Sequence, residues 1–383
     1  MHVDSKTTSC STRPDGGARR CASPLMNRRK PHPRWGFLTP LYLLGVALHR
    51  HIYEWKIIVP FLPSQPTLTL GNLHAGGTGK TPIALWILEQ IQPQVSDVAY
   101  VARGYGRKTK ETRRVELQDT AEEVGDEPRL VRSVFGHSPD VHVIVAHKRR
   151  DAFQMLPKNC PVILDDAMQH WDLKSPITLL ICPYGEWYTE AAVLPAGPLR
   201  ESPEAAGRAS AVVISKCPHP LDAHERLAIA TKLGLRKDQP LFAAQEVMGE
   251  PIPRWNAPAW RGDETALVFS GIGDPRRFES FATAPERFDQ GGVAAVTLRF
   301  PDHSPLDETR CAQIAADAYQ SGCNALLTTG KDLARLPQKP EAWAHLNVYV
   351  LPHEADFGVD RNPFLLWLQN QWKAHGYRVP LQL

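Results

Sequence analysis

Glycines, a lysine and a threonine near the start of the chain have the types and spacing needed to bind phosphate groups. The segment GNLHAGGTGKTP spans 71–82. In a Gly-rich turn that leads into a helix, backbone N–H groups and the helix dipole attract an anion, and the lysine reaches the outer phosphates of a nucleotide. The threonine hydroxyl is a ligand for Mg²⁺. The residues expected to hold the phosphates are Gly76, Gly77, Thr78, Gly79, Lys80 and Thr81.

This loop departs from the strict pattern G-x-x-x-x-G-K-[ST], because His74 occupies the first glycine position. A plain strand-to-helix turn is the alternative, but it does not account for the adjacent Lys80 and Thr81. Two other kinds of nucleotide-binding protein stay open at this point. One is a P-loop ATPase of the partitioning or metal-insertion type, and the other is a regulatory module without catalysis.

A pair of carboxylates follows an apolar run in PVILDD, where Asp165 and Asp166 come after four apolar residues. Gln169 and His170 follow within one turn and are placed to orient Mg²⁺ or water. An acid that merely starts a turn is the simpler alternative. Carboxylates at the end of a strand beside a phosphate loop are the oxygen ligands that a Mg²⁺-nucleotide requires.

Four further polar clusters have only weak meaning when each is taken alone. By themselves they fit turn acids, a structural histidine, a surface ion pair and a basic loop. Their members are Asp126 and Glu127 in GDEP, Asp302 and His303 in PDHS, Arg200 and Glu201 in LPAGPLRES, and Arg103, Tyr105 and Arg107 in RGYGR.

Strands and helices alternate around these clusters. The chain runs from a β-rich segment at 65–73 through the loop into a helical pattern at 81–92, and further continuous apolar strands follow. Strands that are apolar on both faces predict a parallel sheet covered by helices on both sides. The fold class expected is α/β, with two α/β/α sandwich domains. A P-loop kinase-like domain at 61–240 is followed by a short two-stranded linker at 241–262 and a smaller α/β domain at 263–383.

The N-terminal region divides into two segments. Residues 1–34 carry eight Lys or Arg and two acids among Ser, Thr, Pro and Gly, which predicts a disordered basic tail. Translation from Met26 or an organellar transit peptide are the open explanations for it. Residues 35–60 combine a short apolar run with flanking basic and aromatic residues, which is typical of a helix lying in a membrane interface. A helix packed in the core is the alternative, and a secretory signal is disfavoured because no small-residue cleavage site follows.

Composition and apolar run length bear on three questions: a nucleic-acid partner, the redox compartment and membrane-spanning helices. The net charge of +3 gives no argument for a nucleic-acid partner, and the seven cysteines form no CxxC pair, which favours a reducing compartment. No stretch reaches the roughly 18–20 apolar residues of a membrane-spanning helix.

Taken together, the motifs resemble the tetraacyldisaccharide 4'-kinase family, the lipid A 4'-kinases. Nine strings match in family order across about 40–332: PLYLLG, GNLHAGGTGKTP, RGYGR, GDEP, LDDAMQH, LPAGPLRE, SGIGDPRRF, FPDH and TTGKD. The resemblance implies a kinase on the cytoplasmic face of the inner membrane, and a monomer is expected. Its cofactors would be ATP and Mg²⁺, and its partners a lipid disaccharide substrate and the membrane surface. It would phosphorylate the 4'-hydroxyl of a tetraacylated glucosamine disaccharide 1-phosphate in the cleft between two domains.

The same resemblance implies a role for each matching residue. Asp126 would be the catalytic base and His303 its partner. The metal would be held by Thr81, Asp165, Gln169 and Glu201. Substrate and phosphates would be positioned by Arg103, Tyr105, Glu127, Asp165, Asp166, Gln169 and Arg200, with Arg107 also near the anionic head group. The acidic pair in this family is usually followed by Gly-Phe, whereas Ala167 and Met168 stand here, and alanine fits only if its φ is negative.

Overall fold

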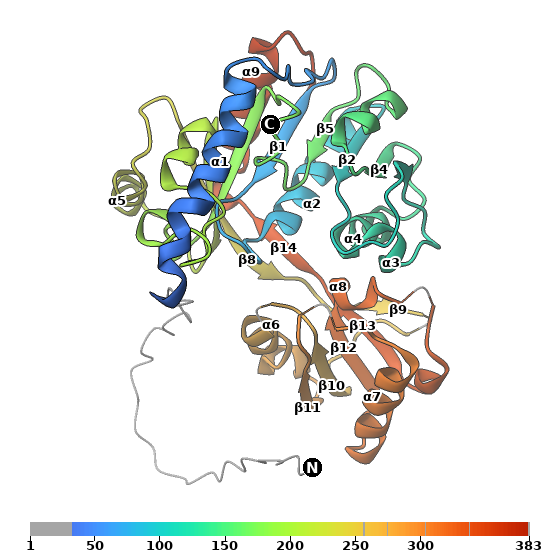
Figure 1. Ribbon diagram of the computed structural model, residues 1–383. Coiled ribbons are helices and arrows are strands. Elements are labelled where there is room, and N and C mark those ends of the chain that lie inside the picture. Colours follow the sequence, from blue (N-terminus) through green and yellow to red (C-terminus); the bar gives the residue numbers. More distant parts are fainter. Residues whose placement is uncertain (1–32, 256, 274, 303, 337, 382–383) are drawn as a thin grey trace.

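The computed structural model describes residues 33–381 except 256, 274, 303 and 337, and within them the chain forms two sheets covered by helices (Figure 1). The larger sheet has the strand order β14-β8-β7-β6-β1-β5-β2-β4-β3. Its strands are β1 (Thr67–Gly71), β2 (Val98–Ala102), β3 (Arg113–Arg114), β4 (Val141–Val145), β5 (Val162–Leu164), β6 (Ile177–Pro183), β7 (Ala211–Cys217), β8 (Leu241–Met248) and β14 (His353–Asp356). All neighbours from β8 to β4 pair in parallel, and only the edge strands β3 and β14 are antiparallel. The predicted parallel sheet is confirmed.

The second sheet has the order β11-β10-β12-β13-β9. Its strands are β9 (Ile252–Arg254), β10 (Thr265–Ser270), β11 (Val293–Arg299), β12 (Ala325–Thr329) and β13 (Asn347–Leu351). Alternate residues of β10 enter different cores. Leu267 packs with Ile314 of one helix, and Val268 packs with Phe278 of another. Helices therefore cover both faces of this sheet, as in the first domain.

The helices are distributed over both domains. They are α1 (Thr39–Glu54), α2 (Lys80–Ile91), α3 (Ala121–Val124), α4 (Asp126–Phe135), α5 (Ala223–Leu233), α6 (Pro275–Ala282), α7 (Glu308–Gln320), α8 (Gly330–Leu333) and α9 (Arg361–Ala374). In the part of the chain that the structure describes, none of them has the length and apolar content needed to cross a bilayer.

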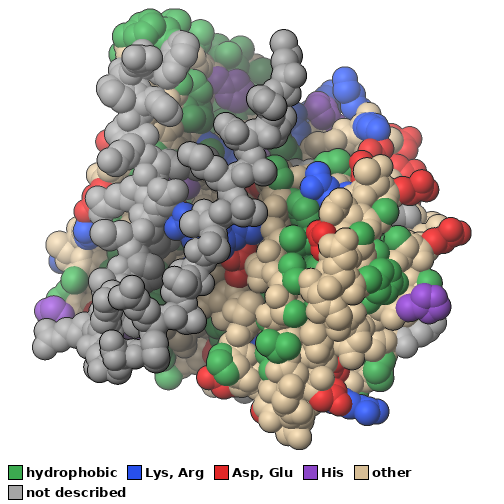
Figure 2. All heavy atoms as spheres, turned by 90° about the horizontal axis from the view of Figure 1, so that it is seen from below, with side chains coloured by type: hydrophobic (Ala, Val, Ile, Leu, Met, Phe, Trp, Pro, Cys, Tyr) green, Lys and Arg blue, Asp and Glu red, His purple; other side chains and the backbone are tan. Residues whose placement is uncertain are grey.

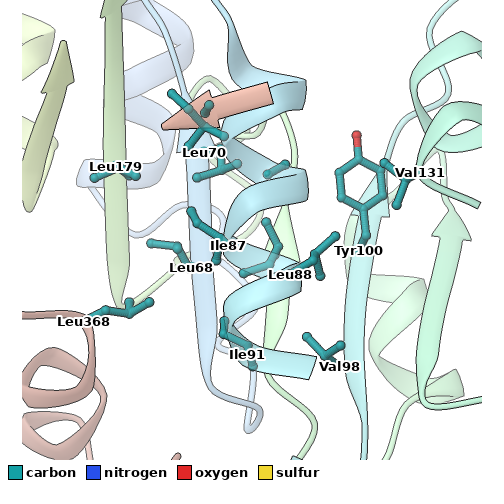
Figure 3. Close-up of a cluster of buried hydrophobic side chains, with 14 of the residues drawn as sticks. Leu68, Leu70, Ile87, Leu88, Ile91, Val98, Tyr100, Val131, Leu179 and Leu368 are labelled. Carbon is teal, nitrogen blue, oxygen red and sulfur yellow. The ribbon is translucent and has the colours of Figure 1, made fainter. Parts of the chain in front are cut away.

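The core beside β1 fixes the phosphate loop in place. Leu68 and Leu70 of β1 pack against Ile87 and Leu88 of α2, and all four side chains are almost completely buried (Figure 3). Burying a side chain of this size stabilises the fold by about 1.5–3 kcal/mol. Because strand and helix are both anchored in this core, the loop between them is held at both ends.

The C-terminal boundary predicted for the second domain is wrong. After β13 the chain returns to the first domain, where β14 pairs with β8 and α9 packs its apolar side into the first core. Figure 3 shows Leu368 of α9 among the labelled side chains of this core. The apolar face of a helix can be identified from its sequence, but the surface that it covers cannot. The second domain therefore occupies 252–351.

The predicted linker at 241–262 also differs from the structure. Residues 241–248 are the strand β8 of the first sheet, and β9 already belongs to the second sheet. The chain crosses between the domains twice. Residues 249–251 lead from β8 to the second sheet, and Pro352 leads from the second sheet back to β14, the antiparallel neighbour of β8. The connection therefore consists of two short crossings and is much shorter than the predicted linker.

Helix α1 lies on the surface of the first domain, and none of its residues is buried. Tyr42 and Leu43 pack against the first domain, whereas Leu41, Leu44 and Leu48 are 60–68% exposed. Helix α1 therefore packs one side on the protein, as in the alternative of a core helix, but it is not buried in the core. The face shown in Figure 2, seen from below, carries basic and acidic side chains mixed with apolar ones.

Candidate active site

A cleft of about 3130 Å³ lies between the domains and collects most of the predicted site residues. Its walls include α1, the phosphate loop, the start of α4, the ends of β5 and β7, and parts of the second domain. Pockets for drug-sized ligands have volumes of about 300–1,000 Å³. The cleft therefore has room for a nucleotide together with a second, larger substrate.

The phosphate loop is braced by three hydrogen bonds from two side chains. Asn72 donates through Nδ2 to the backbone oxygen of His74 at 2.6 Å and to Oγ1 of Thr78 at 3.0 Å. Ser215 at the end of β7 donates to the backbone oxygen of Thr78 at 2.7 Å. Gly79, the residue before α2, has a φ of 83°, which glycine adopts without strain. The loop is thus preorganised at the start of a helix, where anions bind.

Lys80 and Arg200 converge on Asp166. The Nζ of Lys80 lies 3.4 Å from Oδ1 of Asp166, and Nη1 of Arg200 contacts both carboxylate oxygens at 3.0 and 2.8 Å. Burial opposes ionisation of Asp166, but the two cations outweigh it and lower the pKa of this carboxyl group. Asp166 is therefore a stable anion that holds both cations at the loop.

The backbone at Asp166 has a positive φ of 48°, in the left-handed region that non-glycine residues seldom adopt. Such backbone strain tends to be retained at functional sites. Ala167 is not among the described residues with positive φ, so the alanine at this position carries no strain.

Asp165 has a different environment from its neighbour. It is 6% exposed, and Tyr100 donates a hydrogen bond of 2.8 Å to its Oδ2. Burial is the main cause that raises the pKa of Asp165 to about 6, and the nearby charge of Asp166 adds to it, while Lys80 acts in the opposite direction. A cation bound beside this buried carboxylate would stabilise its ionised form.

Three buried side-chain oxygens near the loop have no hydrogen-bond partner within the described chain. They are Oδ1 of Asp165, Oδ1 of Asn72 and Oε1 of Gln169. Gln169 is fixed by a hydrogen bond of 3.0 Å from its Nε2 to the backbone oxygen of Asn72. Carboxylate and amide oxygens are the ligands that Mg²⁺ prefers, so these residues fit the metal. Among the described residues, no group of three or more His, Cys, Asp or Glu side chains could hold one.

Glu201 is engaged elsewhere. Arg208 contacts both of its carboxylate oxygens, at 2.8 and 2.9 Å, and Glu201 is 5% exposed. That Glu201 binds metal stays a prediction, and it would require the carboxylate to give up contacts with Arg208. Arg208 could not be foreseen as its partner, because nothing in the motif LPAGPLRES distinguishes a metal ligand from half of a bidentate ion pair.

The acidic pair of GDEP forms the first turn of α4. Gly125 has a φ of 92°, and a Cβ there would lie 2.8 Å from Cα of Gly104, so the turn before α4 packs directly on the RGYGR loop. Glu127 lines the cleft, and Asp126 is bound by Arg335 of the second domain at 3.1 and 3.0 Å.

The remaining predicted residues divide into three groups. Arg103 and Tyr105 are exposed and line the cleft. Arg107 donates to the backbone oxygen of Glu111 at 2.8 Å and is not among the cleft residues. His303 lies outside the described residues, whereas its neighbour Asp302 lines the cleft.

Sequence reasoning missed several residues that the structure brings to the site. Arg149 is 2% exposed, lines the cleft and donates to Nε2 of His170 at 2.7 Å. Burial and the charge of Arg103 lower its pKa to about 10. Lys331 belongs to the matching string TTGKD, which was the available signal, but no role followed from it. Nothing in the sequence marked Arg149 or Arg335.

Comparison with known proteins decides the family. The family described as tetraacyldisaccharide-1-P 4'-kinase matches residues 36–373. The chain belongs to the tetraacyldisaccharide-1-P 4'-kinase family. A tetraacyldisaccharide 4'-kinase of Parabacteroides distasonis is 31% identical, covering 85% of this chain and 90% of that protein. One from Chlorobium limicola is 32% identical, covering 81% and 91%.

A solved structure supports the fold of this family member. The crystal structure of an "apo" form of LpxK from Aquifex aeolicus in complex with ATP has a TM-score of 0.65 to this chain at 23% identity. The match covers 88% of this chain and 97% of that one. The P-loop kinase-like α/β architecture is therefore shared over nearly the whole length.

Proposed function

We propose that the protein transfers the γ-phosphoryl group of ATP to the 4'-hydroxyl of a tetraacylated glucosamine disaccharide 1-phosphate. The product is the 1,4'-bisphosphate, an intermediate of lipid A biosynthesis. The observation that carries this proposal is the family match over 36–373, which contains both the phosphate loop and the acidic start of α4. A partitioning or metal-insertion ATPase is not favoured, because the curated relatives matched here are 4'-kinases.

Binding of the phosphates falls to the loop. The backbone amides of Gly76, Gly77, Thr78 and Gly79 face the phosphates at the start of α2, and Lys80 exchanges Asp166 for the outer phosphates. Arg200 keeps Asp166 in place during this exchange, since it contacts both carboxylate oxygens. Phosphoryl transfer depends mainly on positioning and charge neutralisation, which this arrangement supplies.

Proton removal is assigned to the first turn of α4. Asp126 accepts the proton of the 4'-hydroxyl as the oxygen attacks the γ-phosphorus and ADP leaves, with His303 as its partner. A positioned base of this kind contributes about 10²–10⁴-fold to the rate. Glu127, Arg103 and Tyr105 orient the substrate from the same wall of the cleft.

Mg²⁺ would be held by Thr81, Asp165 and Gln169, and Asn72 adds a further buried oxygen beside them. Glu201 joins this set only if it releases Arg208. When bound, the ion neutralises charge that develops on the phosphate oxygens. The chain itself contributes oxygens that burial has already desolvated.

A membrane surface would bring in the lipid substrate. Phe37, Leu41, Leu44 and Leu48 recur at helical spacing and are all at least 60% exposed, while Tyr42 on the opposite side donates a hydrogen bond of 2.7 Å to the backbone oxygen of Arg200. An apolar stripe of this kind inserts into the headgroup region of a bilayer. We infer that α1 lies on the cytoplasmic face of the inner membrane, with the cleft opening beside it.

The test is transfer of label from γ-labelled ATP into lipid. Purified protein, ATP, Mg²⁺ and the synthetic disaccharide 1-phosphate should yield a labelled bisphosphate. Asp126→Ala should reduce turnover by at least roughly 100-fold, as expected for loss of a general base, with ATP affinity unchanged. Label released only as free phosphate, with or without the lipid, would refute the kinase assignment.

A further inference from the structure

The proposed base is held by an arginine from the other domain. Asp126 is the first residue of α4, and Arg335 follows α8 in the second domain, 209 residues later. Its Nε and Nη2 both contact Oδ2 of Asp126, at 3.1 and 3.0 Å. The side chains are 6% exposed for Arg335 and 13% for Asp126, so solvent screens this pair only weakly.

Arg335 is fixed within its own domain by the rest of its guanidinium group. Its Nη1 donates to the backbone oxygens of Gly271 and Ser304, both at 3.2 Å, and to Oδ1 of Asp332 at 3.0 Å. Asp332 in turn accepts a hydrogen bond of 3.0 Å from the backbone N–H of Gly271. The guanidinium is thus oriented by three segments of the second domain and presents its remaining edge to Asp126.

A second ion pair runs alongside. Lys331 of α8 lies 3.0 Å from Glu127, the next residue of α4. Burial alone would lower the pKa of Lys331, but Glu127, Asp302 and Asp126 outweigh it and raise the pKa. A Cβ on Gly330 would lie 2.9 Å from Cδ1 of Leu130, so the two helices touch at this point. Two cations of one domain therefore face two adjacent acids of the other.

Stability alone is a weak explanation for this arrangement. Taking an ion pair out of water costs free energy that its attraction often fails to return. Both hydrogen bonds from Arg335 end on Oδ2, however, so they hold that oxygen against one edge of the guanidinium group and do not engage Oδ1. A planar guanidinium with two fixed donors gives directional control that a lysine cannot.

We propose that Arg335 is a positioning residue that orients Asp126 for catalysis when the second domain is docked on α4. This inference rests on the proposed function, because it requires Asp126 to be the base. Arg335 touches neither the phosphate loop nor its bracing residues, so it acts through Asp126. The base is then correctly oriented only while the two domains are in contact.

The experiment is a double-mutant cycle in the lipid kinase assay. Arg335→Gln should lower kcat by roughly 100-fold, the scale of a general base, while KM for ATP changes by less than about 2-fold. In an Asp126→Asn background the same change should alter kcat by less than about 3-fold, because a residue acting only through Asp126 has nothing left to orient. Arg335→Lys should recover part of the loss.

A matched control is Arg310→Gln. This second-domain arginine stacks on Phe300 and is not among the cleft residues, so neither kcat nor KM should change. If the effects of Arg335→Gln and Asp126→Asn multiply, or if Arg335→Gln retains normal kcat while Asp126→Asn is inactive, the positioning role is overturned. If Arg335→Gln does not fold, Arg335→Lys takes its place in the cycle; its loss of kcat should be smaller, and it should still disappear in the Asp126→Asn background.

The base assignment and the proposed function are refuted by different results. Full activity of Asp126→Asn would remove the base assignment and this inference with it. Absence of lipid phosphorylation by the unaltered protein would remove the proposed function itself.

Discussion

The difference in unfolding free energy between Asp165→Asn and the unaltered protein should shift in favour of the variant as the pH rises from acidic to neutral. Asp165 is buried beside Asp166, and its pKa rises from the ordinary 3.8 to about 6. The folded protein therefore keeps a proton between about pH 4 and pH 6 that the unfolded chain has lost. Stability consequently falls as the pH rises through this window and stays lower above it. Asparagine does not ionise, so the Asp165→Asn variant does not lose stability in this way as the pH rises.

The magnitude follows from the two pKa values. The difference between pKa values of about 6 and 3.8 lowers the free energy of unfolding by about 3 kcal/mol at pH 7.5. At pH 4.5 the same effect is about 1 kcal/mol. The stability of Asp165→Asn relative to the unaltered protein should therefore improve by about 2 kcal/mol between these pH values. An unpaired amide hydrogen in the variant would cost free energy too, but equally at both pH values, so the difference isolates the ionisation.

The assay is urea unfolding followed by tryptophan fluorescence at pH 4.5 and pH 7.5, with EDTA present to exclude metal ions. Asp238→Asn is the control, because that side chain is 76% exposed and should give little change. A gap between Asp165→Asn and the unaltered protein that is the same at both pH values would refute the reasoning. In the absence of EDTA, Mg²⁺ with ATP should stabilise the unaltered protein more than Asp165→Asn, which lacks one of the proposed metal ligands.

Three further predictions test other parts of the structure. Leu368→Ala should destabilise the first domain by about 2–5 kcal/mol in urea unfolding, whereas Val359→Ala, at a 75% exposed position, should not; equal effects would contradict the placement of α9 in the first core. Gly71→Ala would put a Cβ 2.3 Å from Cβ of Met168, so it should weaken ATP binding in calorimetry, and Met168→Gly, which removes that second Cβ, should restore it. Lys80→Met should weaken ATP binding by at least roughly 10-fold, as expected for a charged hydrogen bond of 1.5–3 kcal/mol; unchanged affinity would remove Lys80 from the phosphate site.

Local chemistry made much of the site predictable. The loop ending in Lys80 and Thr81, the acids after β5 and the acids of GDEP each follow from short-range patterns, and the structure places Lys80, Asp165, Asp166, Glu127 and Arg200 around one cleft. Glu201 shows the limit of such patterns. Its residue type suited a metal, but whether it is available depends on Arg208, which approaches through the folded chain.

The sequence by itself determined the α/β class, the phosphate loop and the family motifs, because strand apolarity, helical periodicity and loop chemistry act over a few residues. Only the tertiary structure decided that β14 and α9 return to the first domain, and that Arg335 reaches Asp126 across 209 residues. These contacts depend on which surfaces meet after folding. Apolar faces and charged side chains are not specific for one partner along the chain, so that choice is made only when all the elements pack together.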